Sequence, residues 1–334
     1  MASRSLVLIT GINGYIAAHT AATFLKAGYS VRGTIRARNA NVESLVRALT
    51  PYHDGSRLEL VEVPDISVDG AFDRAVEGVQ AIAHLASPVS MTETDPAPMM
   101  RAAVQGTTSL LASAQAESKR EPGNARLKSV VFMSTISAIF SSSQPAGHSF
   151  TETDWNDAAE EEVRNLGKNS PGYVIYQASK TAGEKAFWNF GKETDPPFGM
   201  TALCPALSMR VKDIYDMFYG GPIPEFAPIR STFVDVRDVA DLVLRAIDRD
   251  VQTQGARDRY LLVGQSSISP QGMADVLRER FPERKGIIRE GDPGELYPDM
   301  TWKFDSSKAR ALLGREWIGF QQSVVDSAVS FPRA

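Results

Sequence analysis

The sequence has little cysteine, no clustered histidines, no surplus of positive charge and no long apolar run. Cys204 is the only cysteine in 334 residues, which excludes an intrachain disulfide and a thiolate metal cluster. The formal net charge of −4 offers no basic field for nucleic acid or an anionic membrane. No metal is expected, because metal-site spacings such as H-E-x-x-H are missing around the histidines, which are His19, His53, His84 and His148.

The apolar runs are also too short for a membrane protein. None approaches the roughly 18 residues of a spanning helix, and the N-terminus passes from MASRS into LVLIT without a cleavage site. We therefore expect a cytoplasmic protein. Its composition, 43% hydrophobic and 23% charged, is that of an ordinary soluble chain, and its length allows one large domain with a smaller lobe.

A glycine turn near the N-terminus predicts nucleotide binding. The apolar, β-rich residues 5–10 are followed at once by GINGYIAAHTAATFLKAG, where the periodicity becomes helical. Gly11 and Gly14 stand where a dinucleotide-binding turn needs residues without a Cβ, so that the backbone can approach a pyrophosphate at the helix N-terminus. The third small position is Ala17. The alternative is a turn with a purely structural role.

The residues after the next two predicted strands indicate which cofactor is bound. An acidic residue after the second strand accepts hydrogen bonds from a ribose 2′-OH, whereas arginine pairs with a 2′-phosphate. This chain has Arg36 and Arg38 after residues 30–35, with no carboxylate before Glu43, which favours NADP(H) over a solvated arginine without a ligand. The third strand, residues 57–63, is followed by Asp65, whose carboxylate can reach an adenine, and by Ile66.

Strands and helices then alternate, which predicts an α/β protein with a doubly wound parallel sheet. We expect further strands at residues 80–85, 127–135, 198–204 and 260–263, and helices at 98–118 and before 246. Residues 141–170 read as a polar surface excursion, and the proline- and glycine-rich stretch after Pro205 as an irregular pocket lining. The expected division is a nucleotide-binding domain of residues 1–205 and 231–265, and a C-terminal substrate-binding lobe of residues 206–230 and 266–334.

The stretch PGYVIYQASKTAGEKAFWNF, residues 171–190, places a tyrosine and a lysine one helical turn apart. Tyr176 and Lys180 are neighbours on one face, and a nearby ammonium lowers the pKa of a phenol, so that the pair can act as an acid/base. Y-x-x-x-K alone is also compatible with an exposed tyrosine beside a solvated lysine. The apolar residues that predict one buried stripe along this helix are Val174, Ala178, Ala182, Ala186 and Phe190.

Hydroxyl groups follow the strand at residues 127–135. Thr135 lies at the predicted carboxyl end of this strand, where parallel sheets bind ligands. Ser134, Thr135 and Ser137 are each able to orient a substrate carbonyl. Turn chemistry is the simpler explanation for a serine-rich strand exit.

Several of these motifs, in this order, carry a family resemblance. The anchors are TGINGYIA at 10–17, Arg36, PDIS at 64–67, YQASK at 176–180, FVDVRDVA at 233–240 and LLG at 312–314. Over nearly its whole length the chain resembles the extended short-chain dehydrogenase/reductases. Within them it resembles the dihydroflavonol-reductase-like enzymes and the fungal NADPH-dependent aldehyde and ketone reductases, which implies a Rossmann sheet.

The resemblance implies roles for individual residues. Tyr176 would be the catalytic acid/base, Lys180 would lower its pKa and bind the nicotinamide ribose, and Thr135 would hold the carbonyl where the family usually has serine. Gln105 stands where the family commonly has asparagine in V-N-G-T, and we assign it no catalytic role. The implied cofactor contacts are Gly11, Ile12, Asn13, Gly14, Tyr15, Ile16, Arg36, Asp65, Ile66, Tyr176, Lys180, Pro205, Leu207 and Ser208.

The expected activity is NADPH-dependent reduction of a bulky, uncharged ketone or aldehyde by a monomer or homodimer. By resemblance, the apolar residues near the nicotinamide are Pro88, Val89, Met91, Ile136, Leu207 and Met209, with Met217, Phe218 and Tyr219 further along. The alternative for each is that it fills a core. Two other functions compete: a nucleotide-sugar epimerase or dehydratase, against which Arg36 argues, and a non-catalytic NADP-sensing protein, which would not need both Tyr176 and Lys180.

Overall fold

The computed structural model describes residues 4–53, 55–120, 127–206, 211–224, 232–253, 255–294 and 302–332. The chain forms two compact units. The first contains residues 1–143, 152–204 and 240–260, and the second contains residues 144–151, 205–239 and 261–334. Residues 144–151, 231–239 and 261–265, which the sequence assigned to the nucleotide-binding domain, thus group with the second unit. The functional division between the two parts stays a prediction.

A seven-stranded parallel sheet confirms the expected fold class. Its order is β3-β2-β1-β4-β5-β7-β8. Val7 pairs with Val31 on one side and with Ala81 on the other, and the neighbouring strands from β3 to β7 pair in parallel. The strands are β1 (Arg4–Ile9), β2 (Tyr29–Ile35), β3 (Leu58–Glu62), β4 (Ala81–His84), β5 (Ser129–Met133), β7 (Gly199–Pro205) and β8 (Arg257–Leu262). Their apolar side chains are buried on both faces because helices cover both.

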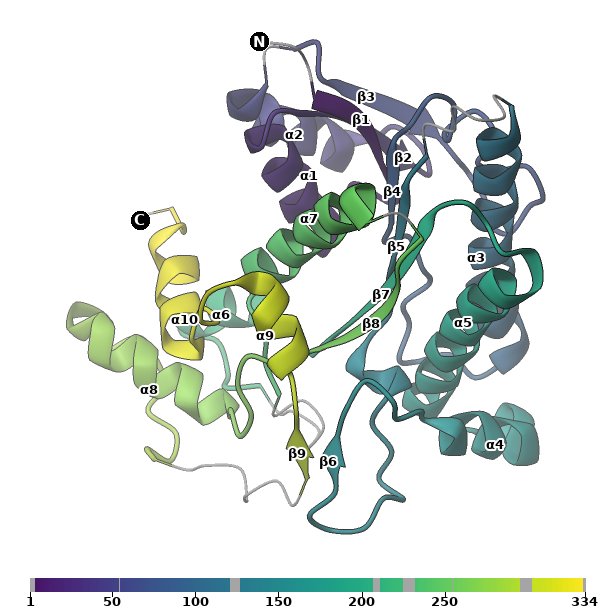
Figure 1. Cartoon of the computed structure of the whole chain (residues 1–334). Helices are drawn as coiled ribbons and strands as arrows, with labels where there is room; N and C mark the ends of the chain where they lie inside the picture. Colours follow the sequence, from purple (N-terminus) through teal and green to yellow (C-terminus); the bar gives the residue numbers. More distant parts are fainter. Residues whose placement is uncertain are drawn as a thin grey trace. The chain divides into compact units, whose positions relative to one another are not determined.

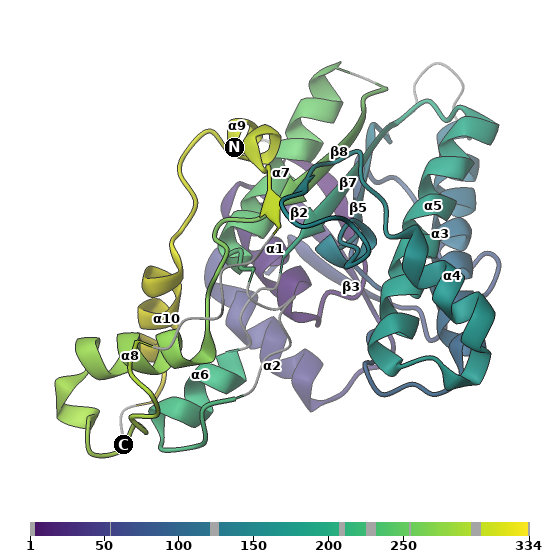
Figure 2. The same cartoon turned by 90° about the horizontal axis from the view of Figure 1, so that it is seen from below.

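Helices lie on the two faces of this sheet. Helices α3 and α5 pack together on one face, and α1 and α7 lie on the other (Figures 1 and 2). The helices of this part of the chain are α1 (Tyr15–Lys26), α2 (Ala40–Leu49), α3 (Pro96–Lys119), α4 (Asp157–Leu166), α5 (Gly172–Thr194) and α7 (Val236–Thr253). The switch in strand order between β1 and β4 places the carboxyl ends of these strands where doubly wound sheets bind ligands.

Helix α5 carries the predicted Tyr176 and Lys180, but its buried face differs from the expected stripe. Val174 and Ala178 are buried, whereas the later apolar positions are only half-buried. A strict four-residue repeat advances by 400° on a helix with 3.6 residues per turn, so the row winds away from the buried side. Lys180, Glu184 and Phe187 are buried instead.

Two helices of the first unit were not expected. Helix α4 lies within residues 141–170, where the sequence indicated only a surface excursion, and packs against α5 through Ala159 and Val163. The Asn156 side chain caps it by accepting a hydrogen bond from the Ala159 amide. Helix α2 begins after Asn39, which caps it through the Val42 amide. Both helices carry apolar residues at helical spacing, Val42, Leu45, Val46 and Leu49 in α2 and Ala159, Val163 and Leu166 in α4, a signal that the prediction did not use.

The second unit has its own core, formed mainly by helices. Helices α6 (Val211–Phe218), α8 (Pro270–Arg280) and α10 (Phe320–Val329) pack together, and α9 spans Ser307–Leu313. Strands β6 (Ser149–Phe150) and β9 (Lys303–Phe304) form a short parallel pair. The expectation of an irregular segment after Pro205 was wrong for residues 211–218, because α6 buries Met217 and Phe218 in this core. The core residues also include Phe233, Met273, Leu277, Phe320 and Val324.

Side chains cap the first turns of α7 and α8. The Ser269 hydroxyl accepts from the Gly272 amide at 2.9 Å and begins α8. At the start of α7, Asp235 accepts from the Arg237 amide at 2.8 Å. Just before α7, Phe233 and Gln265 form an isolated antiparallel bridge.

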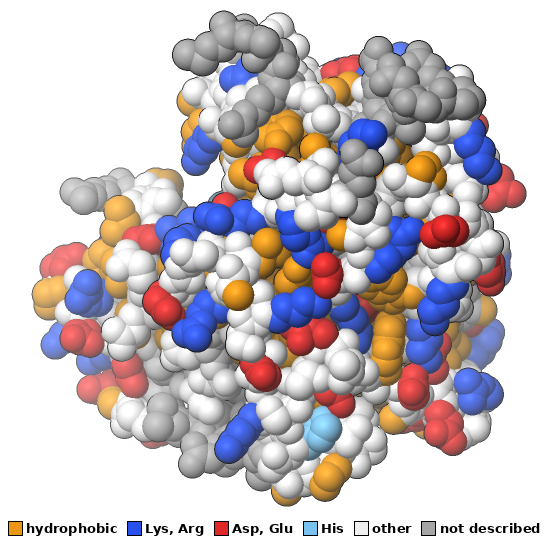
Figure 3. All heavy atoms as spheres, viewed as in Figure 1, with side chains coloured by type: hydrophobic (Ala, Val, Ile, Leu, Met, Phe, Trp, Pro, Cys, Tyr) orange, Lys and Arg blue, Asp and Glu red, His pale blue; other side chains and the backbone are white. Residues whose placement is uncertain are grey.

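The surface carries charges of both signs. Figure 3 shows Lys and Arg side chains interspersed with Asp and Glu on the face drawn. This distribution fits the small net charge of −4. Within the ranges that the structure describes, every helix is too short or too polar to cross a membrane.

Candidate active site

The glycine turn after β1 has the geometry that a dinucleotide needs. Gly11 adopts φ +64°, and a Cβ there would lie 3.2 Å from the Cα and Cβ of Ala86. Its amide donates to the Thr34 hydroxyl at 2.9 Å, which ties the turn to β2. The Gly14 amide donates to the Gly11 carbonyl at 2.8 Å. A side chain at Gly11 would therefore be strained and would crowd Ala86.

The N-terminus of α1 fits an anionic group. Its N-cap is Gly14, which has no side chain to satisfy the first amides, and the first turn contains no acidic residue. The amides of Tyr15 and Ile16 thus keep the partial positive charge that helix N-termini present to phosphates. Ile12 can contribute only its backbone, since its side chain is buried against β2, where a Cβ on Gly33 would lie 2.5 Å from it.

The two arginines after β2 have different environments. Arg38 pairs with Glu43 at 3.4 Å, whereas Arg36 is exposed and close enough to Asp65 to act on it electrostatically. Asp65 accepts from the Ser67 hydroxyl at 2.6 Å and from the Ser67 amide at 2.9 Å. These hydrogen bonds, with a smaller effect from Arg36, hold the pKa of Asp65 below its usual value. Arg36 is therefore the better placed of the two for a 2′-phosphate.

The third strand end contributes a close helix contact. Ile66 is half-buried against α3, where a Cβ on Gly106 would lie 2.8 Å from the Ile66 Cδ1. Asp65, the residue before it, is exposed at the carboxyl edge of β3. The packing of Ile66 against α3 thus fixes the backbone position of Asp65 at the edge of the sheet.

Thr135, Tyr176 and Lys180 are brought together. Thr135 follows β5 and caps the short helix η2 (Ile136–Ala138), accepting from the Ser137 amide at 3.2 Å. Its hydroxyl lies close enough to the Tyr176 phenol to lower the pKa of that phenol. The Lys180 ammonium lies 5.7 Å from the centre of the Tyr176 ring. Of the three candidate hydroxyls, Ser134 is excluded from this contact because it donates to Glu184.

The electrostatics of the pair differ from the expectation. The sequence predicted that Lys180 lowers the pKa of Tyr176, but burial raises the pKa of this phenol and only the nearby Thr135 hydroxyl opposes that effect. Burial also lowers the pKa of Lys180 to about 8. Both changes have the same cause, because a site with little water disfavours the phenolate and the ammonium alike.

His84 is a neighbour of this site that the sequence did not single out. The Thr10 hydroxyl accepts from the amides of Leu85 and Ala86 at 3.0 and 2.9 Å, so its one proton is donated to the His84 Nδ1 at 2.9 Å. His84 is therefore neutral and protonated on Nε2. Burial, and then the nearby Lys180, lower the pKa of His84 to about 3. The available signal was its position at the end of a predicted strand.

Glu184 and Arg259 were missed as well. Glu184 is fully buried on α5, and Arg259 on β8 is 8% exposed; their side chains are 2.6 Å apart. The signal was a glutamate four residues after Lys180, at the spacing that puts both on one helical face.

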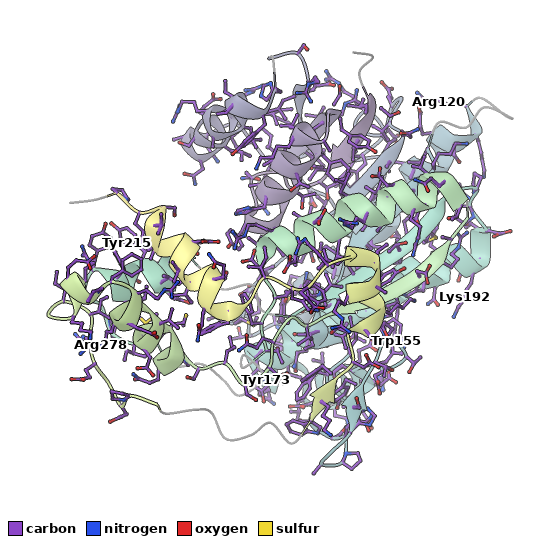
Figure 4. All side chains as sticks on the ribbon, turned by 60° about the vertical axis from the view of Figure 1, so that its left-hand side comes forward. Arg120, Trp155, Tyr173, Lys192, Tyr215 and Arg278 are labelled. Atoms are coloured by element: carbon purple, nitrogen blue, oxygen red, sulfur yellow. The ribbon has the colours of Figure 1, made fainter. Side chains whose placement is uncertain are left out.

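The residues expected to line a substrate pocket divide into several groups. Val89 and Met91 are 69% and 40% exposed, and Ile136 is buried. Tyr173, one turn before Tyr176, is 58% exposed and labelled in Figure 4. Met217 and Phe218 belong to the core of the second unit, so the core interpretation holds for them. Pro205 is the buried last residue of β7, and Leu207, Ser208 and Met209 lie outside the described residues.

Comparison with known proteins identifies the family of this chain. The profile of the NAD dependent epimerase/dehydratase family matches residues 7–260. The chain therefore belongs to the NAD dependent epimerase/dehydratase family.

The chain is similar to individual members over almost its full length. An oxidoreductase of Schizosaccharomyces pombe is 30% identical over 98% of this chain and 96% of that protein. A ketoreductase of Aspergillus fumigatus is 29% identical over 96% of each chain. The crystal structure of yeast methylglyoxal/isovaleraldehyde reductase Gre2 complexed with NADPH covers 97% of each chain with a TM-score of 0.78 and 27% identity.

Proposed function

We propose that this chain is an NADPH-dependent reductase that converts a ketone or an aldehyde to an alcohol, with Tyr176 as the proton donor. The observation that carries the proposal is that Thr135, at the carboxyl end of β5, lies close enough to the Tyr176 phenol to lower its pKa, while the buried Lys180 lies one helical turn further along α5. A substrate carbonyl oxygen placed between the Tyr176 and Thr135 hydroxyls can accept a hydrogen bond from each of them.

The side chains divide the work of the reaction. The pKa of Tyr176 is raised by burial, so the phenol carries its proton at neutral pH, and it can give that proton up only if a neighbouring cation stabilises the phenolate. When bound, the reduced nicotinamide supplies the hydride that forms the new C–H bond. Tyr176 gives its proton to the carbonyl oxygen, Thr135 holds that oxygen, and the Lys180 ammonium stabilises the phenolate that remains.

The cofactor contacts follow from the glycine turn and from the resemblance. The backbone from Gly11 to Ile16 would hold the pyrophosphate, Arg36 the 2′-phosphate and Asp65 the adenine end. Lys180 would bind the nicotinamide ribose. By resemblance alone, Ile66, Pro205, Leu207 and Ser208 complete the set. The NADPH complex of the yeast relative supports this choice of cofactor.

We also propose an uncharged, apolar substrate of some bulk. Val89, Met91 and Tyr173 are exposed although they are large and apolar or aromatic, and Gly172, adjacent to Tyr173, packs against the Met91 carbonyl. Exposed apolar side chains beside a site favour ligands that are recognised by shape. The yeast relative named for methylglyoxal and isovaleraldehyde, and the ketoreductase, are consistent with carbonyl substrates.

The test is a carbonyl panel, from isovaleraldehyde to bulky neutral ketones, followed by NADPH absorbance. Tyr176→Phe should keep NADPH binding and lose turnover by about a hundredfold to ten-thousandfold, the usual cost of a lost general acid. More than about a tenth of wild-type turnover in this variant would contradict the assignment. In a competition arm, micromolar inhibition by a nucleotide sugar, without turnover of any ketone, would favour the epimerase alternative.

A further inference from the structure

Strand β5 is held at both ends by a serine that donates to a buried, arginine-paired carboxylate. Near its start, Ser129 donates to Asp250 at 2.8 Å, and Asp250 pairs with Arg249 at 2.6 Å. Just after its end, Ser134 donates to Glu184 at 2.5 Å, and Glu184 pairs with Arg259. The two arrangements have the same chemistry, but only the second is adjacent to Thr135.

The Glu184 carboxylate is saturated with donors. Arg259 donates to both of its oxygens, at 2.6 and 3.1 Å, and the Trp188 indole donates at 3.1 Å. With Ser134 and no exposed surface, the carboxylate is fixed in position. A buried, bidentate arginine pair with further hydrogen bonds has little freedom to reorient.

Arg259 connects the Glu184 carboxylate to the part of the chain that follows Thr135. Its guanidinium donates to the carbonyls of Glu152 and Asp154 at 2.9 and 2.5 Å, and lies 3.8 Å from the ring centre of Trp155, which is labelled in Figure 4. The next residue, Asn156, donates to the Ser137 carbonyl at 3.0 Å and to the Ala138 carbonyl. Both sides of Thr135 are thus connected to the same ion pair.

Glu184 also shares a helical face with the catalytic pair. Tyr176, Lys180 and Glu184 follow one another at intervals of four on α5. We infer that Ser134 and Glu184 are positioning residues, which set the separation of the Thr135 hydroxyl from the Tyr176 phenol by tying the end of β5 to α5. The path is closed: Tyr176 contacts Thr135, Thr135 is bonded to Ser134, and Ser134 is anchored to the helix that carries Tyr176. The inference rests on the proposed function of Tyr176.

The test compares Ser134→Ala with Ser129→Ala in the full-length protein. Each variant removes one buried serine hydroxyl from an arginine-paired carboxylate on the same strand, so we expect similar losses of Tm. Ser134→Ala should lower kcat for isovaleraldehyde, or for the best ketone of the panel, by about ten- to a hundredfold, because small displacements of a positioned group are costly. Ser129→Ala should leave kcat unchanged. The dissociation constant for NADPH should be unchanged in both.

Two further measurements separate positioning from a general structural effect. A spectrophotometric tyrosine titration, taken as the difference from Tyr176→Phe, should show a higher pKa for Tyr176 in Ser134→Ala, since the effect of the nearby Thr135 hydroxyl, which opposes that of burial, weakens. In the Thr135→Val background, Ser134→Ala should cost nothing more in kcat, because both changes act through one contact.

Equal kcat in Ser134→Ala and Ser129→Ala, or full additivity with Thr135→Val, would overturn the inference while leaving the proposed function intact. Retained turnover in Tyr176→Phe would overturn the proposed function and, with it, the inference.

Discussion

Lys180 carries a charge in a place with little water, and the proposed reaction depends on that charge. Burial lowers its pKa to about 8, so the ammonium loses its proton as the pH rises through that value. Only the charged form stabilises a phenolate on Tyr176. We expect kcat for carbonyl reduction to fall above about pH 8 with the slope of a single proton, in a pH profile at saturating NADPH. The residual kcat of Tyr176→Phe should not fall above about pH 8. A wild-type kcat that is constant from about pH 7 to 9 would contradict the proposed role of the Lys180 ammonium.

The same burial means that the charged form of Lys180 lowers the free energy of unfolding. Below about pH 8 the lysine is charged in both states, and its folded pKa lies below the ordinary 10.5. Between pH values of about 8 and 10.5 the unfolded chain binds more protons than the folded protein, so the free energy of unfolding rises with pH. Over this whole range the rise is about 3 kcal/mol. Lys180→Met removes the buried charge. It should therefore be more stable than wild type at pH 7 by up to that amount, and the gain should shrink towards about pH 10.

Urea unfolding of Lys180→Met and wild type at both pH values measures this effect. The Lys180→Met variant should at the same time lose turnover, because the proposed reaction needs the ammonium. A variant that is less stable than wild type at pH 7 would mean that the folded protein stabilises the charge.

Residue identities were more predictable than residue environments. The spacing of Tyr176 and Lys180 and the position of Thr135 could be read from local patterns. The direction in which the Tyr176 pKa shifts could not be predicted, because it depends on burial by elements distant in sequence. The choice between Ser134 and Thr135 required the position of Glu184, fifty residues later along the chain. Both outcomes are tertiary effects.

Among the elements, those with strong periodicity or clear end signals were predicted. The strand, glycine turn and helix at the N-terminus follow local rules. Helix α6 was missed because the glycines and prolines around it suggested a loop, although Ile214 and Met217 are spaced to share a face. The predicted buried face of α5 was wrong in part, because the actual buried face contains Lys180 and Glu184, which are not apolar.

The N-terminus of α5 depends on the absence of a side chain at Gly172. A Cβ there would lie 2.2 Å from the Met91 carbonyl oxygen, and backbone cannot move aside cheaply. Gly172→Ala should therefore lower the free energy of unfolding by about 1–3 kcal/mol, and should lower kcat because the displaced turn leads directly to Tyr176. Chemical denaturation and kcat measure the two effects.

Gly286→Ala is the matched control for this substitution. No atom lies within 4 Å of a Cβ at Gly286, and its φ is outside the left-handed region, so its stability should change by less than about 0.5 kcal/mol. If Gly172→Ala were as mild as Gly286→Ala, the segment around Met91 would not be a fixed support for α5.

At the scale of the whole molecule, the proposed contacts for the pyrophosphate, the 2′-phosphate and the adenine all belong to the first unit. Gly11, Gly14, Arg36 and Asp65 come from the ends of β1, β2 and β3. A cofactor that binds only the folded protein stabilises it by mass action, by about 2.7 kcal/mol at a hundredfold excess over Kd. Thermal unfolding therefore reports cofactor choice without any turnover.

Arg36 should determine that choice. A charge-assisted hydrogen bond contributes about 1.5–3 kcal/mol, or roughly ten- to a hundredfold in affinity, so at equal concentrations NADPH should raise Tm more than NADH. Arg36→Ala should abolish the difference by weakening NADPH alone. Arg38→Ala is the control, because Arg38 already pairs with Glu43, and it should keep most of the preference for NADPH. Equal loss of both cofactors in Arg36→Ala would mean that Arg36 supports the fold, and a larger effect in Arg38→Ala would assign the 2′-phosphate to Arg38.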